Sequence, residues 1–107
     1  MRAHPTSRAV ELDRVVELRD DSLAHDLLVL RASVAECVVR GQGSVTVDLS
    51  ALTRVSSVAV TALLWARRSC GTRSVAFRVE DVRGNRNRQV LQRCGLLTAP
   101  AGSAATW

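Results

Sequence analysis

The sequence is poor in the residue types on which metal sites, disulfide frameworks and base stacking depend. Its 107 residues include three cysteines, two histidines and only three aromatic side chains. Cys37, Cys70 and Cys94 are odd in number and widely spaced, which suits neither a disulfide framework nor a zinc site, so we expect free thiols. So few rings offer no stacking platform for single-stranded nucleic acid. We therefore predict neither a metal nor another cofactor.

Long apolar runs are also missing. No stretch approaches the roughly 18 apolar residues that a membrane-spanning helix needs. The opening residues Met1-Arg2-Ala3-His4-Pro5 lack the apolar segment of a signal peptide. We expect no membrane span and a cytoplasmic location.

The groups needed for catalysis are scarce as well. Nucleophilic catalysis requires a serine or cysteine beside a base and an orienting group. The two histidines are His4, near the start, and His25, on an expected helix, and neither is placed near a candidate nucleophile. The segment Gly41-Gln42-Gly43 lacks the third glycine and the lysine of a phosphate-binding loop. The sequence therefore indicates a binding protein and not an enzyme.

Positive charge is abundant, and all of it comes from arginine. The fifteen basic residues give a formal net charge of +5. The densest group is Arg83, Arg86, Arg88 and Arg93. Such a group is either a solvated loop or an electrostatic guide for an acidic partner. A basic balance also keeps a nucleic-acid-binding domain as an alternative function of a different class.

The length and the share of hydrophobic residues, 47%, suit one domain with one core. Residues 1–8 show no periodicity and are predicted to be a flexible arm. Residues 98–107 are small and polar apart from Trp107, and are predicted to be a tail. The domain itself is expected to span residues 9–97.

Apolar periodicity predicts alternating strands and helices within this domain. We expect strands at residues 9–19, 45–49 and 75–79 and helices at residues 23–40, 58–69 and 88–94. The alternative for the first strand is a short hairpin turning near Asp13-Arg14. Asp20, Asp21 and Ser22 are expected to cap the first helix. Strict alternation implies parallel neighbouring strands joined by crossover helices. Because the two later strands alternate apolar and polar residues, the helices should cover mainly one face of the sheet.

The segment from Ser44 to Val58, SVTVDLSALTRVSSV, resembles the signature of the STAS family, named for sulfate transporters and anti-sigma factor antagonists. That signature is an apolar strand ending in Asp-Leu-Ser, a short connection, and Asp-Ser-Ser-Gly opening a helix. Val55 and Val58 stand where the family has the Asp and the Gly. The resemblance continues to Arg93-Cys94-Gly95-Leu96, which is similar to a Gly-Leu of the family. It implies an α/β fold with a STAS-like mixed β-sheet and helices mainly on one face.

The resemblance also implies a function. In antagonists of this family, the first serine of the pair is phosphorylated by a partner that is both anti-sigma factor and serine kinase. The dephosphorylated form binds that partner and frees the sigma factor. By position the modified residue is Ser56, with Ser57 as the alternative. A second reading is an unphosphorylated STAS scaffold in a signalling complex or beside a transporter, and a homodimer is possible in either case.

The expected partner surface is the connection before the second helix together with that helix's start. Its residues are Asp48, Ser50, Val55, Ser56, Ser57, Val58 and Trp65. Some of these residues can instead have purely structural roles. The serines can cap the helix, Asp48 can accept hydrogen bonds from the amides around Thr53, and Trp65 can be partly buried beside Val58.

Overall fold

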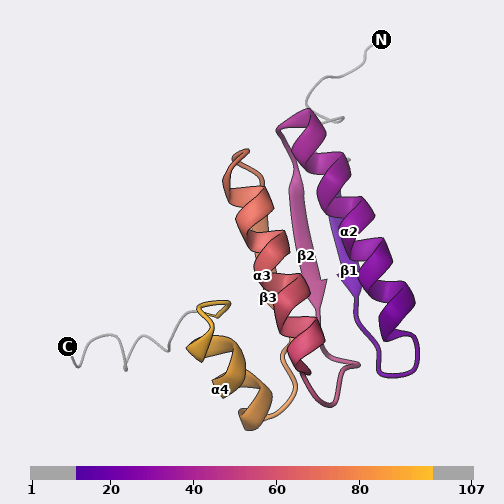
Figure 1. The fold of residues 1–107 in the computed structure, drawn as a ribbon, viewed down its shortest axis with the longest axis vertical. Helices are drawn as coiled ribbons and strands as arrows, with labels where there is room; N and C mark the ends of the chain where they lie inside the picture. The colour runs from indigo at the N-terminus through magenta and orange to yellow at the C-terminus, as the bar shows by residue number, and fades with distance from the viewer. Residues whose placement is uncertain (1–11, 98–107) are drawn as a thin grey trace, which may run out of the picture.

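Residues 12–97, the part that the computed structural model describes, form a parallel sheet flanked by helices (Figure 1). The elements are β1 (Asp13–Glu17), α2 (Leu23–Arg40), β2 (Ser44–Asp48), α3 (Ser57–Gly71), β3 (Ala76–Glu80) and α4 (Asn85–Arg93). The expected arm, the expected tail and residues 9–11 of the first expected strand lie outside the described residues. The predicted order of strands and helices is confirmed.

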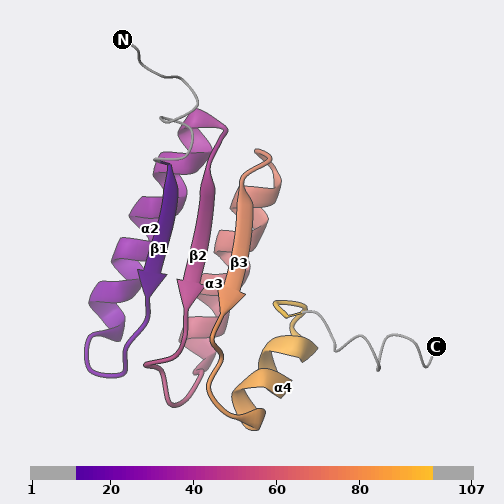
Figure 2. The ribbon, with the colours of Figure 1, turned by 180° about the vertical axis from the view of Figure 1, so that it is seen from behind.

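The sheet has the order β1-β2-β3, and each pair of neighbours is parallel, as the alternation predicted. Val16, Val47 and Val79 are in register and form one row toward the helices. The preceding row, which starts at the exposed Val15, points the other way because side chains alternate along a strand. Both α2 and α3 cover one face of the sheet, and no other helix of residues 12–97 covers the opposite face (Figure 2). Antiparallel pairing, which a mixed sheet requires, does not occur among residues 12–97.

Of the six elements, only α2 has the expected boundaries, and β2 and β3 are each displaced by one residue. The hairpin alternative is wrong, because β1 runs straight through Asp13 and Arg14. Helix α3 begins at Ser57, one residue early, and α4 begins at Asn85, three residues early. The first turn of α4 carries no apolar residue, so apolar periodicity could not detect it.

Helix α2 presents the predicted stripe to the sheet, with Leu30, Val34 and Cys37 fully buried. Its start differs from expectation, because the Ser22 side chain makes no capping bond. The Ser22 hydroxyl donates instead to Asp26 Oδ2 at 2.9 Å, and the Arg19 amide donates to the same oxygen at 2.8 Å. The buried Asp26 carboxylate therefore ties the turn between β1 and α2 to the first turn of the helix.

Two glycines set the turn that returns the chain from α2 to β2. Gly41 ends the helix with a φ of 67°, and its amide donates to the carbonyls of Cys37 and Val38. Gly43 lies so close to Leu12 that a Cβ would meet it at 2.7 Å. Only glycine fits there, so β2 can start directly beside the beginning of β1.

Candidate partner-binding site

The connection from β2 to α3 and the first residues of α3, residues 49–58, are called the corner below. The corner lies at the carboxyl edge of the sheet, beside the connections that enter α2 and α4 (Figure 1). Leu49, Leu52 and Val55 are buried at every third position and anchor it to the core. The Leu52 amide also donates to the Leu49 carbonyl at 3.1 Å. The corner is thus a packed turn with a fixed shape.

Side chains from two other segments hold this turn. Asp20, which follows β1, accepts hydrogen bonds from the amide and the hydroxyl of Thr53. Asn87 of α4, only 5% exposed, accepts from the Val55 amide at 3.1 Å. Its amide group donates to the carbonyls of Thr53 and Arg83. All three hydrogen bonds of the Asn87 side chain are to backbone groups, and two of them join α4 to the corner.

Sequence reasoning missed Asn87. It lies in the segment that we expected to be a polar loop, between arginines, where nothing marks one asparagine as buried. A helix starting at Asn85 would have placed Asn87 in the first turn, but two of the side chain's three partners lie in a connection more than thirty residues away. Its role could be found only from the tertiary structure.

The serine pair lies at the start of α3. Ser56 is half-buried at the N-cap position, and its hydroxyl accepts a hydrogen bond from the Ala59 amide at 3.3 Å. The plainer role as a helix cap is therefore confirmed for Ser56. Ser57 is exposed as the first helical residue, and the first turn contains no acidic side chain. Because unpaired amides gather at a helix start, this end of α3 favours a negative charge.

Asp48 lies just before the corner, and Ser50 lies near its start. Asp48 ends β2, and its Oδ1 accepts from the Ser50 amide at 2.8 Å, while the Ser50 side chain is exposed. The amide of Thr53 is bonded to Asp20, so the expectation that Asp48 accepts from the amides around Thr53 is wrong. Asp48 shapes the turn that leads into the corner.

The two valines that flank the serine pair have opposite environments. Val55 is only 8% exposed and belongs to the core, so the expectation that its side chain forms part of the partner surface is wrong. Its residue type suits this position because the side chain packs inward while its amide is held by Asn87. Val58 is 62% exposed. Of the two, Val58 alone offers apolar surface to a partner.

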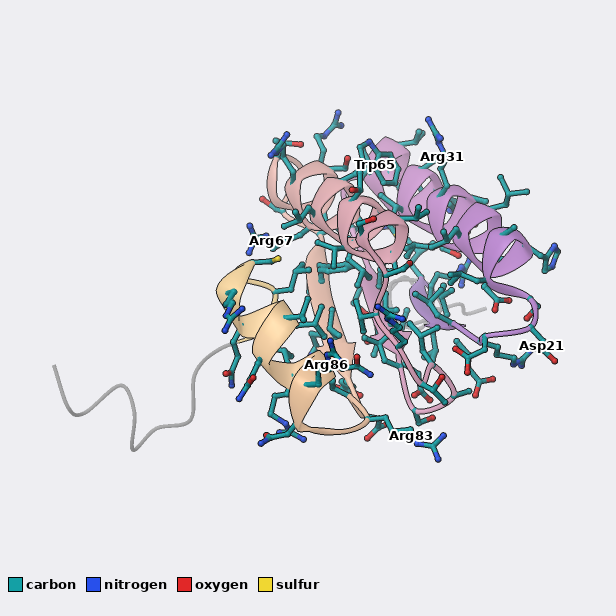
Figure 3. The ribbon with its side chains drawn as sticks, turned by 60° about the horizontal axis from the view of Figure 1, so that its bottom comes forward. Asp21, Arg31, Trp65, Arg67, Arg83 and Arg86 are labelled. Atoms are coloured by element: carbon teal, nitrogen blue, oxygen red, sulfur yellow. The ribbon has the colours of Figure 1, made fainter. Side chains whose placement is uncertain are left out.

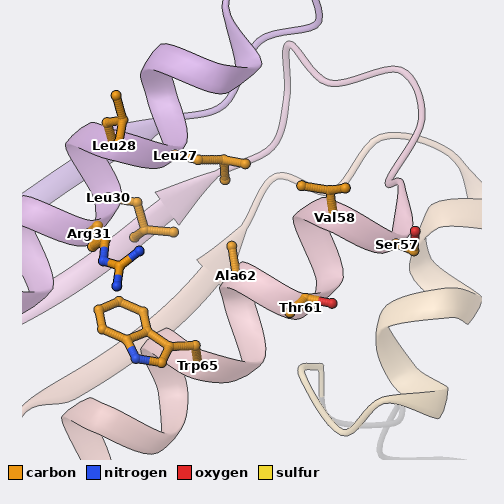
Figure 4. A pocket seen from close by; sticks show the side chains of 9 residues that line it. All are labelled: Leu27, Leu28, Leu30, Arg31, Ser57, Val58, Thr61, Ala62 and Trp65. Atoms are coloured by element: carbon orange, nitrogen blue, oxygen red, sulfur yellow. The ribbon is translucent and has the colours of Figure 1, made fainter.

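Val58 lies at one end of an open groove between α2 and α3, with a volume of about 510 Å³ (Figure 4). Trp65, 39% exposed, stands further along α3, and the guanidinium carbon of Arg31 lies 5.4 Å from the centre of its ring. Trp65 and Val58, seven residues apart on α3, line the same groove. The groove is lined by Leu27, Leu28, Leu30, Arg31, Ser57, Val58, Thr61, Ala62 and Trp65.

A basic hollow of about 250 Å³ lies on the other side of the corner, against the start of α4. Arg54, Arg83 and Arg86 contribute to its lining, and Figure 3 shows Arg83 and Arg86 at the end of the molecule where α4 begins. None of the three forms an ion pair within residues 12–97. The corner is therefore bordered by an apolar groove toward α2 and by positive charge toward α4.

The cysteines are free thiols, as predicted. Cys37 and Cys70 are buried between the helices and the sheet. Burial raises the pKa of the Cys70 thiol to about 11 and also raises the pKa of Cys37. A thiol that stays protonated at neutral pH is a poor nucleophile. These two cysteines therefore serve packing.

Comparison with known families agrees with this geometry. A model of the STAS domain family matches residues 5–100. The chain belongs to the STAS domain family. The resemblance drawn from the Ser44–Val58 segment is thereby confirmed, and so is the α/β fold class. No match was found among curated proteins or among solved structures.

Within the described part of this STAS domain, residues 12–97, no helix is long and apolar enough to cross a membrane. The same residues contain no cluster of three or more histidine, cysteine or acidic side chains that could hold a metal ion. The surface of the STAS domain around the corner offers apolar contact area, hydroxyl groups and guanidinium groups. Such chemistry suits the docking of another polypeptide.

Proposed function

We propose that this STAS domain is a regulator resembling anti-sigma factor antagonists, and that its corner and the start of α3 bind a protein that is both anti-sigma factor and serine kinase. The observation that carries the proposal is the position of the serine pair. Ser56 and Ser57 lie at a helix start, on a turn held by Asp20 and Asn87, directly beside the exposed Val58. A rigid hydroxyl-bearing turn beside apolar surface supports recognition by a protein partner. In this proposal the domain acts in the cytoplasm and catalyses no reaction of its own.

The same position supports a switch by phosphorylation. A phosphate adds a charge of about −1.5 to −2, which the free amides at the start of α3 tolerate. The domain would therefore keep its fold after modification. Against a partner's apolar or acidic surface the same charge costs desolvation and repels, so the complex dissociates. Ser56 is the proposed site, and the more exposed Ser57 is the alternative.

The decisive experiment mixes the full chain with candidate anti-sigma kinases from its host and ATP, and maps phosphate by mass spectrometry. Phosphate at Ser56, together with loss of the complex in a pulldown, is the expected result. The Ser56→Ala and Ser57→Ala variants each remove one hydroxyl and serve as matched controls. Absence of phosphate at both serines would contradict the switch.

A second candidate function is an unphosphorylated STAS scaffold in a signalling or transporter-associated assembly. One observation favours it: the Ser56 hydroxyl is half-buried and engaged by the Ala59 amide, which limits its access to a kinase. In that case Ser56→Ala leaves partner binding intact, while Val58→Asp or Trp65→Ala weakens it. Loss of binding in Ser56→Ala, with Val58→Asp unaffected, would exclude the scaffold.

A further inference from the structure

The groove between α2 and α3 is the main apolar surface beside the corner. Six large hydrophobic residues are exposed among residues 12–97, and three of them, Leu28, Val58 and Trp65, line this groove. Leu28 lines the groove from the α2 side and is 65% exposed, and Leu27 and Leu30 of the same helix point toward α3 (Figure 4). Apolar side chains grouped in a concave surface mark an interaction site more strongly than the same residues scattered singly.

Among residues 12–97, one charged side chain lines the groove, and its charge is positive. Arg31 lies over the Trp65 ring and forms no ion pair with any other residue of the described part, 12–97. No acidic side chain from the described part of the chain lines the groove. Since the stacked guanidinium keeps its hydrogen-bond donors free at the edge of its plane, a carboxylate can pair with Arg31 while the contact with Trp65 persists. The electrostatics therefore favour an occupant with negative charge.

We propose that this groove binds an amphipathic helix of the partner protein, with its apolar face between α2 and α3 and an acidic side chain paired with Arg31. Two helices packed side by side on a sheet leave a trough between them that accepts a third helix lying along it. Apolar residues at positions i, i+3 or i+4, and i+7 would contact Leu28, Val58 and Trp65. The inference rests on the proposed function, because it names a second part of the surface that the partner contacts.

The position of the groove also links it to the serine pair. Ser57 lines the same end of the groove as Val58. A phosphate at the start of α3 would place negative charge at the mouth of a surface that selects an acidic helix. Like charges brought together at an interface oppose binding. An acidic occupant thus gives the phosphorylation switch a direct electrostatic cause.

The test uses a yeast-displayed library of 16-residue helical peptides, selected for binding to the full chain. Enriched peptides should share the apolar spacing given above together with an Asp or Glu. Synthetic copies are then titrated by fluorescence anisotropy against the chain and its variants. In a Trp107→Phe background, the emission of Trp65 reports occupancy of the groove.

Two variants and one control locate the binding site. Arg31→Gln should weaken the selected peptides about three- to fivefold, the range of a solvent-accessible ion pair. Val58→Asp should weaken them at least about tenfold, because it puts a charge into the apolar contact, while an acid in the first turn of α3 does not harm the helix. The matched control Val39→Asp changes an exposed valine of α2 that does not line the groove, and should change affinity less than about twofold, as expected for a site without contact.

Three outcomes overturn the inference: no peptide is enriched, the enriched peptides are basic, or Val58→Asp binds them as well as Val39→Asp does. The kinase experiment is independent of these results. Phosphorylation at Ser56 without peptide binding in the groove refutes the inference and leaves the proposed function standing. Groove binding without phosphorylation at either serine refutes the switch and leaves the groove as a docking site.

Discussion

Replacing Asn87 with alanine tests whether α4 holds the corner. The change removes three hydrogen bonds and leaves the amide of the buried Val55 without its acceptor. Each net hydrogen bond contributes about 0.5–1.5 kcal/mol, and an unsatisfied buried group costs about 1–3 kcal/mol. Because alanine is the better helix former, the substitution also raises the free energy of unfolding by a few tenths of a kcal/mol. We expect Asn87→Ala to lower the free energy of unfolding by about 2–4 kcal/mol.

Urea unfolding measures this loss, with the midpoint falling by about 1–2 M at an unchanged slope. Asn85→Ala is the matched control, since Asn85 is an exposed asparagine in the same helix turn. Asn87→Asp distinguishes the hydrogen bond that the side chain accepts from the two that it donates. It keeps an acceptor for the Val55 amide but places a carboxylate against the carbonyls of Thr53 and Arg83. Amide exchange of Val55 should accelerate in Asn87→Ala. A loss below about 0.5 kcal/mol, the size of an ordinary surface substitution, would refute the reasoning.

Three further predictions concern other parts of the domain. Ser56→Ala removes the α3 cap and should lower the free energy of unfolding by about 1 kcal/mol, measured by urea unfolding. The Arg14 guanidinium lowers the pKa of the Glu36 carboxyl. The pair therefore stabilises the fold at a pH above the ordinary glutamate pKa of about 4.3. This stabilisation is lost as the pH falls through the lowered pKa of the folded state. The difference in stability between Glu36→Gln and the unaltered chain should therefore shrink in acid, and a constant difference would contradict the pairing. A disulfide reagent should label the half-buried Cys94 first, and label Cys70 only as the protein unfolds, because Cys70 is buried and its pKa is raised to about 11.

The parts of the fold set by local pattern were predictable from the sequence. The α2 stripe repeats every three or four residues, and the alternating valines of β2 match a strand with one covered face, so element type and order followed directly. The Asp-Leu-Ser and Ser-Ser motifs also placed the serine pair at the start of a helix. These features depend on residues close together in the chain.

The remaining features depend on partners that are distant in sequence. Val55 looked like exposed apolar surface because it replaces an acidic residue of the family signature, yet the turn packs it into the core. Asp20 was expected to cap α2, but its carboxylate bonds Thr53, which lies 33 residues away. The pairing of Arg31 with Trp65 joins two helices whose relative placement no local periodicity reveals.

The hydrogen bonds of Asn87 and Asp20 have a consequence for engineering. The corner does not hold its conformation by itself, because its backbone amides donate hydrogen bonds to Asp20 from the connection after β1 and to Asn87 from α4. Transplanting residues 49–58 alone into another scaffold would transfer the sequence of the corner but not its conformation. A graft that copies Asp20 and the first turn of α4 as well should reproduce it.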